Sequence, residues 1–230
     1  MSTIQTDHFK IDTHRYDEKL LLYPPLHVAD ETKKIISLLK KKDVKTVIDF
    51  GCGNGRLSIP LLQAGFHVSA VDISKESLER LVMIAKKLQC DRYLTVSSHI
   101  PEGSFDAVVG TDILHHVTVG EELKKLKLVL RKGGEIVFSE PNFLNISWII
   151  FITLFLDWRV EKGIIQCNHF SLRSVLNRHG FEGIRFDGFA FIPPPFVNRI
   201  PVFRGLNYYV GTLPFLKIFA YRIIVSASKR

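Results

Sequence analysis

The sequence has few cysteines and no hydrophobic run long enough to cross a membrane. Three cysteines occur among 230 residues, an odd number that favours a reducing compartment over a disulfide framework. The uncharged, mostly apolar stretch Ile146 to Leu156 spans eleven residues, whereas a membrane-spanning helix needs about 20. Residues 1–10 contain acidic residues and no apolar core, so we expect no signal peptide and a cytoplasmic protein.

Other classes of site are also missing. No set of histidine, cysteine and carboxylate residues has metal-ligand spacing, so we predict no metal site. The net charge of +8 and the pI near 9.4 favour an anionic partner. The lysines and arginines nevertheless cluster on the expected outer faces of amphipathic helices, and no RNA-binding motif lies among them. We therefore expect no nucleic-acid partner and a weak attraction to membrane surfaces.

The most informative stretch is a strand followed by a glycine-rich turn and a helix. Val47 to Phe50 is a mostly apolar segment that predicts a buried strand. Glycines at positions 51, 53 and 55 allow the backbone to bend and a ligand to approach closely. Leu57 to Ala64 follows with a helical pattern and is stopped by Gly65. This arrangement predicts a nucleotide site at the helix N-terminus.

The spacing within the turn restricts the ligand. A dinucleotide fingerprint needs a third glycine where Arg56 stands, and a P-loop needs a lysine that this turn lacks. Asp49 precedes Gly51 by two residues and suits a cationic group rather than a pyrophosphate. A second predicted strand, Phe66 to Asp72, ends in a carboxylate that can accept the two hydroxyls of a ribose. The two acids indicate an adenosine-like ligand with a positively charged tail.

These segments resemble the class I S-adenosylmethionine-dependent methyltransferases. The matching motifs are Asp49 to Gly55, Val71 to Ser74, Phe105 to Val117 and Leu126 to Phe138, and they cover roughly residues 45–140 in the expected order. The resemblance implies an enzyme that uses S-adenosylmethionine and releases S-adenosylhomocysteine. It also implies an α/β, Rossmann-like fold whose seven-stranded, mostly parallel sheet has helices on both faces and an antiparallel last strand.

The resemblance also implies the residues that bind the cofactor. They come from the glycine turn, the ends of the next strands and the segment after the fourth strand: Asp49, Gly51, Cys52, Gly53, Gly55, Asp72, Ile73, Ser97, Ser98, Thr111 and His116. Ser97 and Ser98 stand where the family usually places an acid against the adenine amino group. We therefore expect backbone groups to contact the adenine edge.

The chain reads as one methyltransferase domain over residues 1–230. We expect an N-terminal lid and helix (1–44), a cofactor-binding core (45–140), a hydrophobic substrate-side region (141–217) and a final strand (218–230). Tyr16 is a candidate for the lid. Ser74 is expected to cap the helix that follows it, and Gly133-Gly134 to end the helix of residues 121–130. One hydrophobic insertion follows the fifth strand, and another, with prolines that argue against a regular helix over 189–203, precedes the last strand.

Methyl transfer from a sulfonium is an in-line displacement, so the protein mainly aligns the acceptor and excludes water. A base is needed where the acceptor must lose a proton, and imidazole suits that role. In similar enzymes the segment after the fourth strand borders the transferred methyl, so His115 is the first candidate. His169, in a segment that resembles one facing the active site, is the second. His116 is expected to pack beneath the cofactor, and a purely structural role stays open for each histidine.

The acceptor is expected to be small and hydrophobic: a quinone-like ring, a polyketide or a lipid-linked compound. A histidine near the methyl would help a hydroxyl most, so oxygen is the expected atom. The insertion after the fifth strand is loosely similar to that of ubiquinone-pathway O-methyltransferases. An RNA or protein methyltransferase and a non-catalytic cofactor-binding partner subunit are the alternatives. Residues 146–156 are interpreted as core, lid or peripheral membrane contact.

Overall fold

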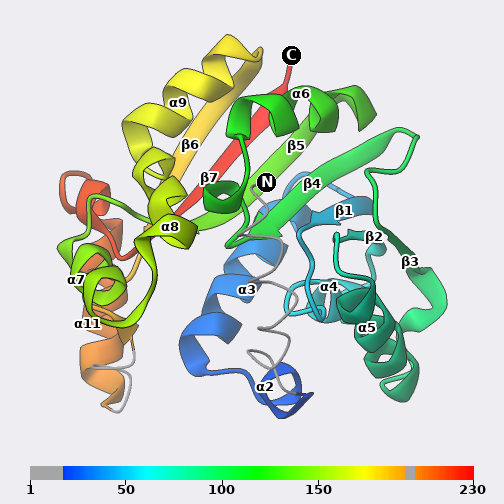
Figure 1. The fold of residues 1–230 in the computed structure, drawn as a ribbon, viewed down its shortest axis with the longest axis horizontal. Coiled ribbons are helices and arrows are strands. Elements are labelled where there is room, and N and C mark those ends of the chain that lie inside the picture. Colours follow the sequence, from blue (N-terminus) through cyan, green and yellow to red (C-terminus); the bar gives the residue numbers. More distant parts are fainter. Residues whose placement is uncertain (1–17, 195–199) are drawn as a thin grey trace.

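The computed structural model describes residues 18–194 and 200–230 (Figure 1). Tyr16, the candidate lid residue, lies outside these ranges. Within them the chain forms one sheet of seven strands in the order β3-β2-β1-β4-β5-β7-β6. The strands are β1 (Thr46–Phe50), β2 (His67–Val71), β3 (Leu94–Ser97), β4 (Phe105–Thr111), β5 (Leu130–Pro141), β6 (Phe181–Phe189) and β7 (Arg222–Lys229).

The strand directions confirm the predicted fold class. Strands β1 to β5 run parallel to one another, and β7 runs antiparallel to both β5 and β6. Parallel neighbours need crossover connections, which the intervening helices supply. The carboxyl ends of β1, β2 and β4 consequently meet at one edge of the sheet, where ligands bind in open α/β folds.

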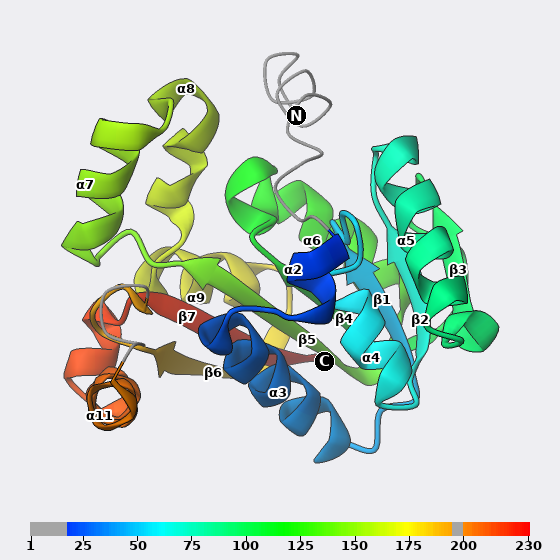
Figure 2. The ribbon, with the colours of Figure 1, turned by 90° about the horizontal axis from the view of Figure 1, so that it is seen from below.

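Helices cover both faces of the sheet, so its central strands are buried on both sides (Figure 2). One core joins α3 (Leu26–Lys40), α4 (Ser58–Gln63) and α5 (Lys75–Lys87) to the sheet. The other joins α6 (Val119–Val129) and α9 (His169–Arg178) to the opposite face. Alternate residues of β4 enter different cores, with Val108 in the second and Val109 in the first. This placement follows from the two-residue period of a strand.

Two insertions extend the fold at one end. After β5 come α7 (Ile146–Phe155), α8 (Trp158–Glu161) and the 3₁₀ turn η3 (Lys162–Gln166). Before β7 come α11 (Pro201–Thr212) and η4 (Leu216–Phe219). In Figures 1 and 2, α7 and α11 lie at the end of the molecule away from α5. Shorter elements complete the described chain: α2 (Glu18–Leu22), η1 (Asp91–Tyr93) and η2 (Leu114–His116). None of the helices described is both long and apolar enough to cross a membrane.

Three local predictions differ from the structure. Gly133 and Gly134 do not end a helix, because α6 ends at Val129 and the two glycines lie inside β5. Strand β6 was not predicted from its own residues, whose two internal glycines and alternating charges weaken the strand pattern. The oily segment before the last strand does contain a helix, α11. Pro201 stands at its first position, where proline loses no helical hydrogen bond.

Candidate active site

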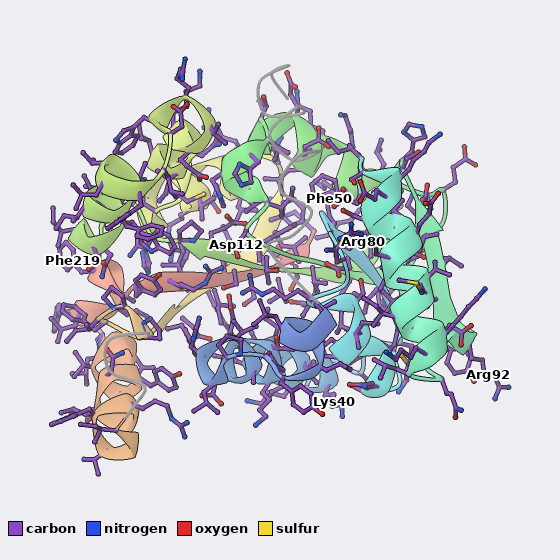
Figure 3. The ribbon with its side chains drawn as sticks, turned by 60° about the horizontal axis from the view of Figure 1, so that its bottom comes forward. Lys40, Phe50, Arg80, Arg92, Asp112 and Phe219 are labelled. Atoms are coloured by element: carbon purple, nitrogen blue, oxygen red, sulfur yellow. The ribbon has the colours of Figure 1, made fainter. Side chains whose placement is uncertain are left out.

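A large cavity opens at the carboxyl ends of the parallel strands. Its volume is about 1040 Å³, at the upper end of the roughly 300–1,000 Å³ typical of small-molecule sites. The turn after β1, the end of β2 and the segment after β4 supply one side, and α7 supplies another. Asp112 and Phe50, which both line it, lie near the middle of the molecule in Figure 3. The size suits a nucleoside together with a second molecule.

The glycine turn is built for close approach. Gly51 has φ +75°, and a Cβ there would lie 2.5 Å from Cγ1 of Ile113, so a side chain at this position would collide with the segment after β4. Gly53, with φ +49°, lines the cavity, and a Cβ added to it would meet no atom within 4 Å. The backbone is therefore bare toward the cavity at Gly53, as a bound nucleoside requires. Gly55 faces Leu81 instead and does not line the cavity.

Asp72 fixes the geometry between this turn and the second strand. One carboxylate oxygen accepts a hydrogen bond of 2.8 Å from the Gly53 amide, and the other accepts one of 2.9 Å from the Ser74 amide. Burial raises the pKa of Asp72 from its ordinary value, and these backbone donors oppose that rise. Ser74 also caps α5 as expected, by accepting from the Ser77 amide. Asp72 also lines the cavity.

Asp49 occupies a different place from the one expected. It is fully buried, does not line the cavity, and accepts a hydrogen bond of 2.6 Å from the Ser58 hydroxyl at the start of α4. Burial raises the pKa of Asp49 to about 7, with the Ser58 hydrogen bond acting in the opposite direction. Asp49 is thus set back from the cavity lining, and its contact with a cationic ligand stays a prediction. Its carboxyl group anchors the helix that follows the glycine turn.

The other predicted cofactor residues divide into two groups. The cavity is lined by Cys52, Ile73, Ser98, Thr111 and His116. Ser97 is not in the lining; its hydroxyl accepts a hydrogen bond of 3.1 Å from the His99 amide and so shapes the loop after β3. The Ser97 side chain therefore holds the backbone of the loop that borders the cavity, whereas Ser98 itself lines the cavity.

A closed ring of four charged side chains lies at one wall of the cavity. Arg56 donates to Glu31 at 2.7 Å and to Asp112 at 2.6 Å. Arg222 contacts the same two carboxylates, at 2.9 and 2.7 Å. Burial opposes ionisation of Asp112, but the charges of the two arginines outweigh it and hold its pKa well below the usual range. The ring is neutral overall, and it joins α3, the glycine turn, the end of β4 and the start of β7.

Sequence reasoning missed this ring. Asp112 lies within a recognised motif and Arg56 directly follows another, but Glu31 and Arg222 are 191 positions apart and match no motif. The hydroxyl of Ser139, near the end of β5, also donates to Glu31. The carbonyl oxygen of Ser139 accepts a hydrogen bond of 3.1 Å from Arg222. Glu31 falls among the apolar positions of α3, next to Val28 and Ile35 on its buried side. Because isolated charges are rarely buried, an acid at such a position is the sequence signal that could have indicated a charged partner.

His115 lines the cavity and is held by a carboxylate. Its Nδ1 atom lies 2.6 Å from Oε2 of Glu140, whose other oxygen accepts hydrogen bonds from the Ile113 and Leu114 amides. Its Nε2 atom lies 3.6 Å from Glu161. Burial disfavours the charged ring, but the hydrogen bond and charge of Glu140 outweigh it, so the pKa of His115 is raised. Glu140 was not among the predicted site residues.

The other two candidate histidines have different surroundings. His116 lines the cavity, with its ring centroid 3.8 Å from that of His115. His169 does not line the cavity, and its ring packs against Phe186 of β6 at 4.7 Å. Burial, reinforced by the positive charges of Lys217 and Arg173, lowers the pKa of His169 to about 4. His169 therefore lies apart from the cavity lining, and its catalytic role stays a prediction.

Among the residues that the structure describes, two sets of side chains bring possible metal ligands within 4.8 Å of one another. One is His115, Glu140 and Cys167, in which burial raises the pKa of the Cys167 thiol well above its usual range and disfavours the metal-binding thiolate. The other is His115, His116 and Glu161, and it has the better chemistry for a cation. Spacing along the chain could not indicate this set, because Glu161 comes from the insertion.

The insertion after β5 supplies an apolar wall. Trp148, Phe151, Ile152 and Leu156 line the cavity. The Trp148 ring stacks on Tyr221 at 4.8 Å, and its Nε1 atom donates to the Tyr221 carbonyl at 2.7 Å. The sequence left core, lid and membrane contact open for this stretch. The structure gives α7 one side that faces the cavity and another that is exposed.

The insertion also touches the backbone of the candidate base. Gly163 in η3 packs so closely that a Cβ there would lie 1.8 Å from the His115 carbonyl oxygen. The Gln166 side chain donates to the carbonyls of Leu114 at 3.3 Å and Val117 at 3.1 Å. The apolar wall and the histidine segment are therefore parts of one rigid arrangement.

Comparisons with known proteins agree with this geometry. A family model described as a methyltransferase domain matches residues 26–185. The chain is similar to a ubiquinone biosynthesis O-methyltransferase of Idiomarina loihiensis, with 32% identity over 65% of this chain and 66% of the relative. Across the first three curated relatives, the matched part covers 57% to 66% of the relative's own length.

Solved structures show the same fold. Magnesium protoporphyrin IX methyltransferase from Synechocystis, solved with bound S-adenosylhomocysteine, superposes with a TM-score of 0.60 at 21% identity. That match covers 87% of this chain and 83% of the other. A SAM-dependent methyltransferase from Archaeoglobus fulgidus superposes with a TM-score of 0.59 at 18% identity, over 86% of this chain and 94% of the other.

Proposed function

The chain belongs to the class I S-adenosylmethionine-dependent methyltransferases, and on that premise we propose that it methylates a hydroxyl oxygen of a small hydrophobic acceptor. The observation that carries the proposal is the pairing of His115 with Glu140 at the cavity wall, opposite the apolar side chains of α7. A general base and an apolar wall in one cavity suit an acceptor that has a hydrophobic ring or alkyl chain and a hydroxyl group.

The cofactor half of the cavity fits an adenosine-like ligand. The bare backbone at Gly53 and the Asp72 carboxylate would hold the nucleoside, and the polar edge of Ser98 lies on the same side of the cavity. S-adenosylmethionine supplies a methyl group already activated by its sulfonium. The residues of this chain then need only to bind, orient and exclude water.

His115 would take the acceptor proton. Glu140 accepts a hydrogen bond at Nδ1, which leaves Nε2 as the atom that can accept a proton from the substrate. Because Glu140 stabilises the charged ring, the imidazolium that forms on proton transfer is favoured. This is the contribution that a hydroxyl acceptor needs and that an already basic amine, once neutral, does not.

The hydrophobic character of the acceptor follows from the wall of α7. Trp148, Phe151 and Ile152 present side chains without a charge to the cavity. Their burial against a ring or alkyl chain would contribute roughly 25 cal/mol per Å² of apolar surface covered. A polar acceptor such as an RNA base would leave this wall without a partner.

The test is a turnover assay with methyl-labelled S-adenosylmethionine and four acceptors: a long-chain alkyl catechol, the matching alkyl amine, total RNA and a protein extract. We expect label in the catechol, at the oxygen. His115→Ala should lower this turnover by about 10²–10⁴-fold while S-adenosylhomocysteine affinity changes little. His67→Ala is the matched control, because His67 is exposed at the start of β2 and does not line the cavity, and it should retain the turnover of the parent chain.

Other outcomes would contradict the proposal. Label found only in RNA or protein would show that the acceptor is a macromolecule, which the basic surface would then bind. Cofactor binding without turnover on any acceptor would favour a non-catalytic partner subunit. Equal losses in turnover and in S-adenosylhomocysteine affinity for His115→Ala would give this histidine a structural role.

A further inference from the structure

Helix α7 exposes apolar side chains on the side that does not face the cavity. Ile146, Ile150 and Leu154 recur every four residues and lie on one face, and Leu154 is 66% exposed. Phe155, in the last turn, is 70% exposed. The helix contains no charged residue at all. Helices at a protein surface normally turn such a face inward, so this face needs an apolar partner.

Helix α11 also exposes an apolar face to solvent. Its outward residues Val202, Leu206 and Tyr209 share one face, and Val202 is 77% exposed. The inward side carries Asn207, whose amide accepts from the Phe191 and Ile192 amides and donates to the Ile192 carbonyl. Polar groups therefore fix the helix from within, and apolar groups point to solvent.

Hydrogen bonds join the two insertions into one surface. Asn145, which caps α7, donates to the carbonyls of Phe191 at 2.9 Å and Phe219 at 2.8 Å. Asn142 donates at 2.8 Å to the carbonyls of Ile218 and Ala220. In Figure 3, Phe219 lies at the same end of the molecule as α7 and α11. We call this end the apolar end; its exposed residues are Ile146, Ile150, Phe151, Leu154, Phe155, Val202, Phe203, Leu206, Tyr209, Phe215, Leu216 and Phe219.

The charges around the apolar end have one dominant sign. No aspartate or glutamate occurs between residues 141 and 156 or after Asp187, and Asp157, which follows α7, is paired with Arg159. Arg204 lies within the second insertion, and the exposed Lys162 follows α8. The whole chain carries a net charge of +8. An apolar face bordered by cations matches the surface of a bilayer that contains anionic lipids. In a symmetric pair the same cations would face each other, which disfavours a second copy as the partner.

The lengths of the helices set how they would contact a bilayer. Ten residues in α7 and twelve in α11 extend for about 15–18 Å, roughly half of a 30 Å hydrocarbon core. Neither can span the bilayer. Each can lie along its surface with the apolar face in the interfacial layer.

The exposed face continues into the cavity. Phe151 is 43% exposed at the apolar end and also lines the cavity next to Trp148 and Ile152. A molecule dissolved in the bilayer could therefore pass from the lipid to the apolar wall along one continuous surface. This path would spare a hydrophobic acceptor from crossing water.

We propose that the apolar end docks on the surface of an anionic lipid bilayer and that the acceptor enters the cavity from the lipid. The docking stands on the surface alone, whereas the entry of the acceptor rests on the proposed function. Docking is thus testable without cofactor or acceptor.

The experiment measures co-flotation of the full chain with phosphatidylcholine vesicles, with and without phosphatidylglycerol. We expect binding to the anionic vesicles that weakens with salt. The double variants Ile150→Glu/Leu154→Glu and Leu206→Glu/Tyr209→Glu should each lower the partition coefficient by about tenfold or more. Met83→Glu is the matched control: Met83 is 60% exposed on α5, at the other end of the molecule, and its replacement should change binding less than about twofold.

Integrity of the variants is checked by their affinity for S-adenosylhomocysteine, and the milder pair Ile150→Gln/Leu154→Gln serves if the glutamates impair folding. Wild-type chain that does not float with anionic vesicles would overturn the proposal, as would double variants that bind like wild type. A wild-type dimer that the same substitutions dissociate would assign the apolar end to a second copy. Turnover on a detergent-dissolved catechol is measured separately, so failure of docking and failure of the proposed function give different results.

Discussion

His115 and Glu140 share a buried hydrogen bond of 2.6 Å although they come from different segments of the chain. Glu140 lies near the end of β5, and His115 lies in the 3₁₀ turn after β4. The second Glu140 oxygen accepts from two amides of that same turn. One carboxylate therefore sets both the position of the turn and the proton affinity of the imidazole.

Replacement of Glu140 by glutamine should change the pH dependence of turnover. A base must be neutral to accept a proton, so turnover should rise with pH through the raised pKa of His115, above 6.5. Loss of the negative charge disfavours the imidazolium and lowers this pKa, so the rise should move toward lower pH. Poorer orientation should lower the plateau by about tenfold or more. The measurement is the pH profile of kcat/KM.

With its oxygen accepting from the two amides, glutamine should keep the turn in position. Its NH2 group then faces Nδ1 and favours the tautomer protonated at Nε2, which cannot take the acceptor proton. Glu182→Gln is the control, because Glu182 is exposed and pairs with Arg230 far from the cavity. A profile that keeps its midpoint in Glu140→Gln would show that Glu140 has only a structural role.

Asp49→Asn should remove a pH-dependent loss of stability. Burial raises the pKa of Asp49 to about 7 in the folded chain, against an ordinary value near 3.9 when unfolded. The folded state thus binds more protons between these values, and its stability falls as pH rises from about 4 to 7. Asparagine still accepts from Ser58 and carries no charge. We expect the variant to be more stable at pH 8 by about 1–3 kcal/mol, with little difference at pH 4, as measured by urea unfolding.

Asp72→Ala should weaken the binding of S-adenosylhomocysteine more than tenfold, since it removes both the group expected to hold the ribose and a bond to the Gly53 amide. Calorimetry measures the affinity. Asp91→Ala, in an exposed turn before β3, is the control. Unchanged affinity in Asp72→Ala would refute the ribose assignment.

Arg222→Leu should destabilise the fold strongly. The substitution leaves the buried Glu31 carboxylate with one arginine fewer, and breaking a buried ion pair costs about 3–5 kcal/mol. Arg230→Ala breaks an exposed pair with Glu182 instead and should cost no more than about 1 kcal/mol. Chemical denaturation compares the two, and equal small losses would show that the ring of charges adds little.

The sequence predicted what neighbouring residues determine. The glycine turn, the cap at Ser74 and the acid at Asp72 lie in short motifs whose chemistry is local. His115 lies in the turn directly after a strand that the pattern predicts. Side-chain partners brought together by the fold left no such trace. Glu140 is 25 positions from His115, and no periodicity links them.

The side-chain directions of two other predicted site residues show the same limit. Asp49 has the expected residue type at the expected spacing, but the strand turns its carboxyl group toward Ser58 rather than toward the cavity. His169 follows a cap that the structure contains, and yet its ring points to Phe186. The direction of a side chain depends on packing across elements, which a motif does not encode.

The close contact of Gly163 with the His115 carbonyl has a consequence for engineering. Exchange of α7 alone between relatives would join a foreign helix to a junction shaped for the native one. A chimera with a new acceptor preference should therefore carry the whole segment from Asn142 to Gln166. The side-chain amides at its two ends donate hydrogen bonds to backbone carbonyls outside the segment, those of Ala220 and Val117. The natural unit of exchange is the segment between those two amides.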